Sequence, residues 1–294
     1  MMKGFHLEKF KKIIQLKPNE SLQWRLMKLS LAYTWLLVIS SILMKLSSPH
    51  LTEGLCWVIP CNLLSGWYVR LILFMMGLVL CVFYTLGIGM KKTCVLLAFL
   101  SILIFSYEEA NGIYSRAALF SVLFICHAIA SIFFSNSEKT SIQFSIQAVA
   151  AIYTLSGLSK LVNSGLAWVT NGPYLLLQIK KGSYFKYYDR GNTEILNENN
   201  QMIEFFIDNP IVLTILLSMV LALEICSGLM IIKPKIAFFY GLLLFLMSFG
   251  IYLVMNILIV PIFYPMLIVL VNPLYLFWKG VKGVIGFGRK QFNK

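Results

Sequence analysis

Histidine is scarce in this chain, and the common enzyme motifs are absent from it. Three histidines among 294 residues argue against a multi-histidine metal site, and so against a di-iron or haem enzyme. The sequence contains no Walker loop, no dinucleotide-binding glycine pattern and no H-E-x-x-H zinc motif. It also lacks the aspartate pair of intramembrane proteases. We therefore predict no metal site and none of the familiar soluble-enzyme chemistries.

Charged residues are also few, at 13% of the chain, whereas 59% of the residues are hydrophobic. Long apolar runs recur from Trp24 to Trp278, and no soluble core of this size requires them. Helices are expected because backbone amides that face lipid must be paired within their own segment. The sequence predicts an all-α, polytopic integral membrane protein, a helical bundle with about eight transmembrane helices and interfacial outer loops, in the lipid bilayer of a cell membrane.

The predicted spans follow from the apolar runs. They cover residues 26–46, 67–89, 92–107, 117–135, 142–161, 210–232, 236–254 and 258–278. The third run is short of the ~20 residues that a span normally needs. The last two runs are nearly continuous, so seven spans are the alternative. We divide the chain into a basic segment at 1–25, a transmembrane domain at 26–278 and a basic tail at 279–294.

The formal net charge of +13 comes from lysines and arginines near the ends of apolar runs. They do not form a basic face interleaved with aromatic residues, so no nucleic-acid binding is expected. Short cytoplasmic loops are enriched in lysine and arginine. A cytoplasmic N-terminus and C-terminus place one set of basic residues on that side: Lys3 to Lys28, Lys91, Lys92, Lys139, Lys233, Lys235 and the tail. Since residues 1–25 are basic and no cleavage site follows, we expect the first apolar run to stay in the membrane, with 4–17 as an amphipathic surface helix or a plain basic tail.

Two predicted outer loops are more than connectors. Residues 47–66 carry a disulfide candidate, Cys56 and Cys61, beside Pro60. Two free thiols are the alternative, and a C-x4-C pair without further ligands is a weak metal signal. Residues 162–209 mix tyrosines with lysines and turn near residues 189–192, which predicts a flap lying at the membrane interface.

Ionisable side chains inside apolar runs are costly unless they face a cavity or a partner, so each is a candidate functional residue. Lys160 lies near the end of the fifth run, one turn after Ser156, and Gly157 allows a helix or a ligand to approach closely. Glu224 lies near the middle of the sixth run, and Lys160 is its candidate partner. Two alternatives stay open: a lysine reaching from a helix end to the interface, and a purely structural ion pair.

Other polar residues lie at or within the predicted spans. Glu108, Glu109, Asn111 and Arg116 cluster between the third and fourth runs, either as a solvated turn or as part of a site. His127 lies inside the fourth run. A single membrane histidine is more often hydrogen-bonded structure than a metal ligand.

The stretch from Tyr153 to Gly172 carries a motif. Its residues spell Y-x-x-S-G-L-S-K-L and then W-V-x-x-G, with the lysine at Lys160 and the second part beginning at Trp168. This pattern resembles the A-G-x-x-K-L helix end and W-x-x-G loop of the vitamin K-dependent gamma-carboxylase family and of its bacterial relatives, the HTTM (horizontally transferred transmembrane domain) proteins. A V-N-P-x-Y run at residues 271–275 and the helical layout extend the resemblance loosely over most of the chain.

The resemblance implies a catalytic role for Lys160, as the base that deprotonates a reduced quinone of the vitamin K type. In that family the quinol then reacts with oxygen, and the strong base so formed removes a proton from a glutamate before carbon dioxide adds. A lysine amine can act in this way only where burial disfavours its charged form. The substrate-binding residues would be Ser156, Gly157, Asn163, Trp168, Glu224, Asn111 and Glu108. The partner, besides the bilayer, would be a small lipophilic molecule.

The chain also departs from that family. It ends at Lys294, 16 residues after Trp278, without the large lumenal domain, so protein gamma-carboxylation is not expected. Gly112 stands where the family has a histidine after an asparagine. The alternative is a non-catalytic accessory protein for maturation or export of a secreted peptide, as in the bacterial sporulation-delaying toxin system. A transporter gated by Lys160 and Glu224 is disfavoured because no inverted repeat is detected.

Overall fold

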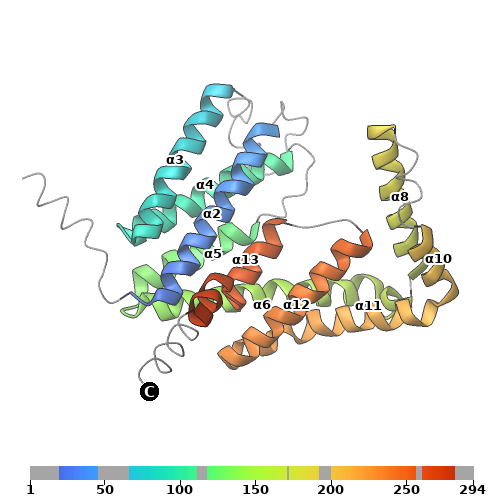
Figure 1. Ribbon diagram of the computed structural model, residues 1–294. Helices are drawn as coiled ribbons and strands as arrows, with labels where there is room; N and C mark the ends of the chain where they lie inside the picture. Colours follow the sequence, from blue (N-terminus) through green and yellow to red (C-terminus); the bar gives the residue numbers. More distant parts are fainter. Residues whose placement is uncertain are drawn as a thin grey trace, which may run out of the picture. The chain divides into compact units, whose positions relative to one another are not determined.

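The structure is a computed structural model that describes residues 20–45, 66–110, 118–170, 172–191, 200–255 and 260–281. Within these ranges every regular element is a helix (Figure 1). The predicted helical membrane bundle is therefore confirmed. The structure does not describe most of the N-terminal basic segment, of the loop 47–66, which contains Cys56 and Cys61, or of the C-terminal tail. The predicted disulfide and the predicted orientation of the two ends therefore stay predictions.

Each of the eight predicted runs contains a helix. These are α2 (Leu22–Lys45), α3 (Trp67–Leu86), α4 (Met90–Ala110), α5 (Ala118–Phe133), α6 (Ser137–Ser164), α11 (Pro210–Ile225), α12 (Pro234–Met255) and α13 (Val260–Leu270). The 3-10 helix η3 (Cys226–Ile231) continues α11. Six helices of the described ranges are long and apolar enough to cross a membrane, with a bent pair as a seventh span.

The third and fourth predicted spans form helices of different lengths. The third run forms α4, which has 21 residues with polar residues at both ends, and its candidate span Met90–Tyr107 has 18 residues. The fourth run forms α5, which has only 16 residues and falls below the length of an ordinary span. The eight apolar runs therefore give six or seven spans in the described part of the chain.

The chain divides into two compact units, Met1–Ala148 with Ile259–Lys294, and Val149–Leu258. The boundary falls within α6. In the first unit, α4 packs against α3 and α5, and α2 packs against α3 and α13. Its core is built on Trp35, whose indole N–H donates to Ser101 Oγ at 2.7 Å and whose ring meets Phe124 edge to face. Gly77 makes room for that ring, since a Cβ there would lie 2.9 Å from Trp35 Cζ3.

The seventh candidate span is broken at Asn272. Ile262–Leu270 and Pro273–Val281 meet at an angle of 43°. Asn272 has a φ of 49°, a left-handed conformation that asparagine tolerates better than most residues. Its side-chain oxygen accepts the Tyr275 N–H at 3.3 Å, while its amide donates to Gln23 O at 2.9 Å. The V-N-P-x-Y run thus ends one helix, caps the next and ties the break to the start of α2.

In the second unit, most of the described part of the predicted outer loop, residues 162–209, is helical. α6 continues to Ser164, and then come α7 (Ala167–Thr170), α8 (Gly172–Arg190) and α10 (Asn200–Asp208). The turn expected at 189–192 is present, since α8 ends at Arg190 and Gly191 has a φ of +68°. A small apolar core joins α8, α10 and α11 through Leu176, Ile203, Phe206 and Leu213.

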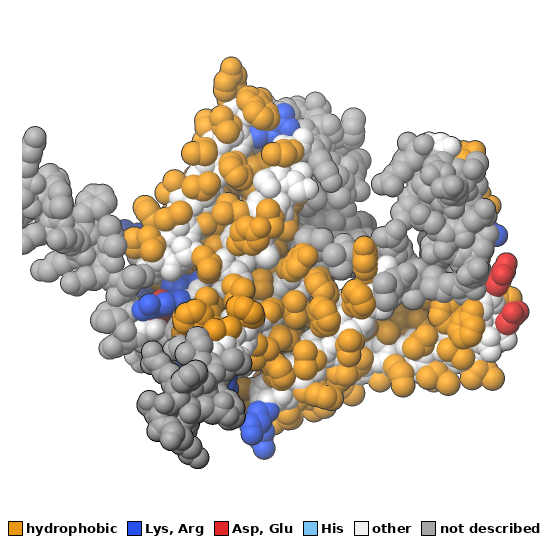
Figure 2. All heavy atoms as spheres, in the orientation of Figure 1, with side chains coloured by type: hydrophobic (Ala, Val, Ile, Leu, Met, Phe, Trp, Pro, Cys, Tyr) orange, Lys and Arg blue, Asp and Glu red, His pale blue; other side chains and the backbone are white. Residues whose placement is uncertain are grey.

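The surfaces of the helices match a lipid environment. On the face shown in Figure 2, hydrophobic side chains cover most of the described helices. Only 17% of the span Pro234–Tyr252 is buried inside the structure, against 56% of Leu22–Met44. Apolar surface of that extent is too large for a soluble monomer, so the chain is a multi-pass membrane protein with lipid-facing helices.

Candidate functional site

The candidate site begins where α6 and α11 touch at Gly157. A Cβ on Gly157 would lie 2.9 Å from Ile225 Cγ1 and 3.0 Å from both Glu224 Cβ and the Ile225 backbone nitrogen. Any larger side chain would push the two helices apart. Small residues at such a crossing are typical of helix packing in membranes. Of the two roles open to Gly157, close approach of a helix is therefore the one observed.

Hydroxyl groups hold the same crossing together. Thr154 Oγ1 and Ser227 Oγ lie 2.9 Å apart, and Ser227 Oγ also donates toward Ala150 O at 3.1 Å. Ser227 lies in η3, where α11 changes from α-helical to 3-10 geometry directly after Ile225. Such a change within a span often marks a functional or strained position. Glu224 thus occupies the last turn of α11, at a fixed register against α6.

Lys160 and Glu224 form an ion pair across this crossing. The Lys160 ammonium lies 2.5 Å from both carboxylate oxygens of Glu224. The Lys160 side chain is 26% exposed, whereas that of Glu224 is only 7% exposed. A lone carboxylate at this depth would be costly, and the lysine compensates its charge. The pairing proposed from the sequence is present, with the lysine as its more accessible member.

Trp168 completes the local arrangement from α7. α6 ends at Ser164, and Gly165 has a φ of +59°, a left-handed conformation that lets the chain turn back. Its N–H donates to Leu161 O at 2.8 Å. The Lys160 ammonium lies 4.7 Å from the centroid of the Trp168 ring, within range of a cation–π interaction. The two halves of the sequence motif therefore meet in space.

Of the other predicted site residues whose side chains the structure describes, Asn163 and Ser156 do not bond to this pair. Asn163 is exposed, and its amide donates to Ser159 Oγ at 3.1 Å. Ser156 is half-buried on α6, and in the described ranges its hydroxyl bonds neither Lys160 nor Glu224. Glu108 belongs to α4 in the first unit, but its side chain lies outside what the structure describes, as does all of Asn111.

Comparisons with protein-family models, curated proteins and solved structures found no match. The resemblance to the gamma-carboxylase family therefore rests on residues 153–172 and is kept only as a proposal.

A second ion pair lies in the first unit and was not predicted from the sequence. Lys28 was assigned to the basic cytoplasmic end, but its side chain is fully buried and its ammonium donates to Glu20 Oε1 at 2.8 Å. Arg25 Nε lies 3.6 Å from the other oxygen of Glu20, and the Lys28 ammonium lies 5.7 Å from the Trp24 ring. The available signal was its position, since Lys28 falls inside the predicted span 26–46.

His127 is the centre of a buried polar network in the first unit. Its Nδ1 lies 2.8 Å from the Tyr84 hydroxyl and its Nε2 lies 2.8 Å from Ser145 Oγ. The Trp24 ring meets it edge to face at 5.1 Å. Because both ring nitrogens are bonded to protein groups, the structural interpretation of His127 is confirmed.

Proposed function

We propose that this chain is a membrane protein with an acid–base site, in which Lys160 acts as base on a lipophilic quinol. The observation that carries the proposal is the unequal exposure of the Lys160–Glu224 pair. A purely structural pair needs neither partner to be accessible. Here the carboxylate is closed in against α6, while the amine is open to an approaching molecule.

The pair can hold one proton on either partner. Transfer of a proton from the Lys160 ammonium to Glu224 gives an amine and a carboxylic acid, with no change in net charge. The amine can then take the hydroxyl proton of a quinol, so that an O–H bond breaks and an N–H bond forms. The quinolate anion is left beside the Lys160 ammonium.

The surroundings of Lys160 suit an apolar substrate. Leu158, Val162 and Leu166 are exposed near it in the sequence, on α6 and on the turn that follows. The face of Trp168 stabilises a cation at Lys160, which is the state that the base reaches after it accepts a proton. An apolar tail has hydrophobic side chains to contact, and a polar ring has the amine.

The first test is binding and turnover of a reduced naphthoquinone. Wild type and Lys160→Ala are purified in detergent, bound lipids are extracted, and oxygen-dependent conversion of the quinol is measured. We expect turnover by wild type and a loss of at least about a hundredfold in the variant, since general base catalysis typically contributes 10²–10⁴-fold. The control is Lys180→Ala, an exposed lysine of α8. Equal turnover by wild type and Lys160→Ala, or binding and conversion by neither, would overturn the proposal.

One observation favours the accessory-protein alternative. α8 exposes aromatic and apolar side chains, among them Tyr174, Leu177, Tyr184 and Tyr188. Aromatic side chains of this kind are common at membrane interfaces and in peptide-binding surfaces. If this helix holds a secreted peptide, then replacing Tyr184 and Tyr188 by serine will abolish peptide maturation as completely as Lys160→Ala does. If only Lys160 matters, the acid–base proposal is preferred.

A further inference from the structure

A cavity with several polar side chains in its lining lies at one end of the helices in the first unit. It has a volume of 550 Å³ and is bounded by the start of α2, the turn between α3 and α4, the end of α5 and the start of α6. Its polar lining includes Lys91, Lys92, Ser131, Ser135, Asn136 and Ser137. A cavity of this size accommodates a small organic group. It is distinct from the Lys160 site, which belongs to the other unit.

The lining itself holds two lysines and two glutamates, and an excess of positive charge arises from Lys28 and Arg25, which pair with Glu20 behind the lining. Lys91 and Lys92 are exposed, and neither forms an ion pair within the described ranges. Two carboxylates also line the cavity, but both are engaged. Glu20 faces Lys28 and Arg25, and Glu138 accepts hydrogen bonds from the Ser21 N–H at 3.3 Å and from the Ser21 hydroxyl. The two lysines are therefore free to bind an anion.

Two helix starts add to this field. α4 begins at Met90 and α6 begins at Ser137, and both residues line the cavity. The first turn of a helix presents unpaired N–H groups and the positive end of the helix dipole. The Ser135 and Ser137 hydroxyls and the Asn136 amide supply neutral donors, whereas the Ser131 hydroxyl already donates to Ala128 O at 2.9 Å. Together with the two lysines, these groups form a surface suited to phosphate oxygens.

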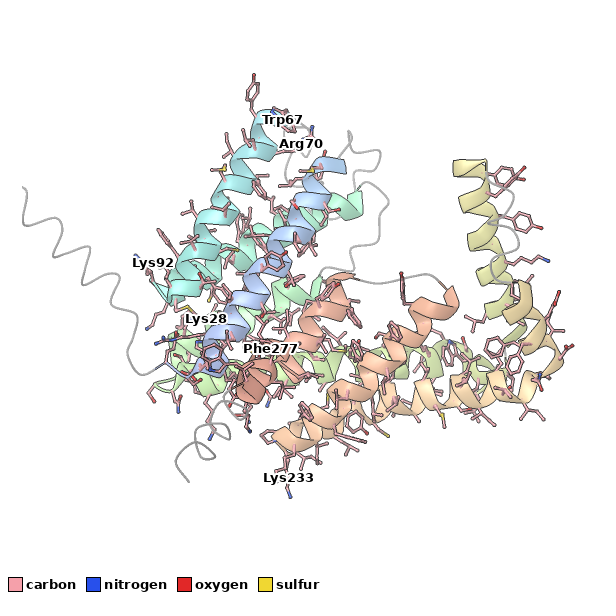
Figure 3. The ribbon with its side chains drawn as sticks, in the orientation of Figure 1. Lys28, Trp67, Arg70, Lys92, Lys233 and Phe277 are labelled. Atoms are coloured by element: carbon pink, nitrogen blue, oxygen red, sulfur yellow. The ribbon has the colours of Figure 1, made fainter. Side chains whose placement is uncertain are left out.

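The position of the cavity favours the phosphate of a lipid headgroup over a soluble phosphate. Lys92 and Lys28 lie at one end of the first unit's helices, and Trp67 and Arg70 lie at the other (Figure 3). The cavity is therefore at the level where apolar spans end and lipid headgroups begin. Leu86, Phe133 and Phe134 are exposed on the ends of α3 and α5 that flank it. These side chains can contact acyl chains, which a soluble phosphate lacks.

We propose that this cavity binds the phosphate group of an anionic phospholipid, with Lys91 and Lys92 as its charged ligands. The lipid headgroup occupies the cavity, and its acyl chains lie along α3 and α5. A lipid held here fixes the turn between α3 and α4 against the start of α6.

The test measures lipid retention by native mass spectrometry of the detergent-purified full chain. Phosphatidylglycerol and phosphatidylcholine are titrated against wild type, against the double variant Lys91→Gln with Lys92→Gln, and against Lys233→Gln with Lys235→Gln. The last variant removes the same charge at another helix end, where Lys233 and Lys235 are also exposed. Each lysine near an anionic headgroup increases the binding affinity about fivefold. The first double variant should therefore bind phosphatidylglycerol about thirtyfold more weakly than wild type, whereas the affinity of the control should hardly change.

Two further experiments test whether the headgroup lies inside the cavity and whether the ligand is a lipid or a soluble phosphate. Ser135→Trp leaves the charge unchanged and fills the cavity, so it should reduce phosphatidylglycerol binding by about tenfold or more if the headgroup lies inside. Glycerol 3-phosphate should compete only weakly, since it lacks acyl chains. Strong competition by it would assign the site to a soluble phosphate and overturn the lipid source. Equal binding of phosphatidylcholine, or equal losses in the two double variants, would overturn the site itself.

Discussion

A lysine–glutamate pair lies inside the apolar helices of each unit in the part of the chain that the structure describes, and these two pairs differ in how open they are. In the first unit, Lys28 is fully buried and Glu20 is 12% exposed. In the second, Lys160 is 26% exposed and Glu224 is the more buried partner. Each ammonium also lies near a tryptophan ring, at 5.7 Å in the first pair and 4.7 Å in the second. The environments are alike, so the difference lies in which charge can be reached.

This comparison separates a structural pair from a functional candidate. A buried pair whose cation is inaccessible to solvent affects stability mainly when one partner is removed, because the other charge is then buried and uncompensated. A pair whose cation is open can exchange its partner for a substrate. Position in an apolar run selected Lys160 as a candidate but passed over Lys28. Exposure, which only the structure gives, distinguishes the two lysines and is the basis of the proposed role of Lys160.

The largest effect is expected from Glu20→Ala. It leaves the Lys28 ammonium buried without its carboxylate, which should lower the free energy of unfolding by about 3–5 kcal/mol. SDS-induced unfolding of the purified protein measures this. The double variant Glu20→Gln with Lys28→Met removes both charges and should recover most of the stability. A loss below about 1 kcal/mol for Glu20→Ala would show that Lys28 is not a closed structural charge.

A smaller loss is expected from Gly157→Ala at the second pair. The added Cβ would lie about 3 Å from Glu224 and Ile225, including a backbone nitrogen that cannot move alone. Overpacking of this kind costs about 1–3 kcal/mol. Gly250→Ala is the matched control, because a Cβ there meets nothing within 4 Å. Equal stability of the two variants in the same unfolding assay would argue against close contact of α6 and α11.

Glu224→Gln and Glu20→Gln test the comparison directly. Both substitutions keep the shape and remove one charge. Glu20→Gln should destabilise the protein more, because Lys28 cannot reach water whereas Lys160 is a quarter exposed. The expected difference is about 1–2 kcal/mol in SDS-induced unfolding. The reverse order would mean that the second pair is the more important structural contact.

The smallest effect is expected from Trp168→Leu. It removes the aromatic face next to the Lys160 ammonium and keeps an apolar side chain. The loss should be about 0.5–1 kcal/mol, as for cation–π contacts at partly exposed sites. Trp67→Leu, at the start of α3 beside Arg70, is a comparable exposed control. No measurable change would remove Trp168 from the site.

The sequence predicted the helices better than the connections between them. Apolar runs located the eight helices because a span must be apolar over its whole length. The helices α8 and α10 were predicted as loop, because a segment that mixes tyrosines, lysines and phenylalanines has the hydropathy of a loop. The Gly172–Pro173 pair was an available signal for the start of α8, since proline favours the first turn of a helix.

The candidate site was predictable only in part. Lys160, Glu224 and Trp168 were found because a costly charge and a motif pointed to them. Asn163 was included by proximity in the sequence, and its α-helical position directs it away from the pair toward Ser159. Lys28 was missed because a lysine near a basic terminus has an ordinary explanation. Its pairing with Glu20 depends on how the chain enters α2, which hydropathy does not encode.

The most direct measurement is the activity and stability of the charge-swapped variant Lys160→Glu with Glu224→Lys. The swap keeps an ion pair at the α6–α11 crossing but moves the amine to the closed side. We predict that the free energy of unfolding of the swapped variant lies no more than about 1 kcal/mol below the mean of the two single variants. We also predict that the swapped variant loses quinol conversion. Wild-type conversion by the swapped protein would contradict the account, because it would mean that the accessible amine of Lys160 has no role in the chemistry.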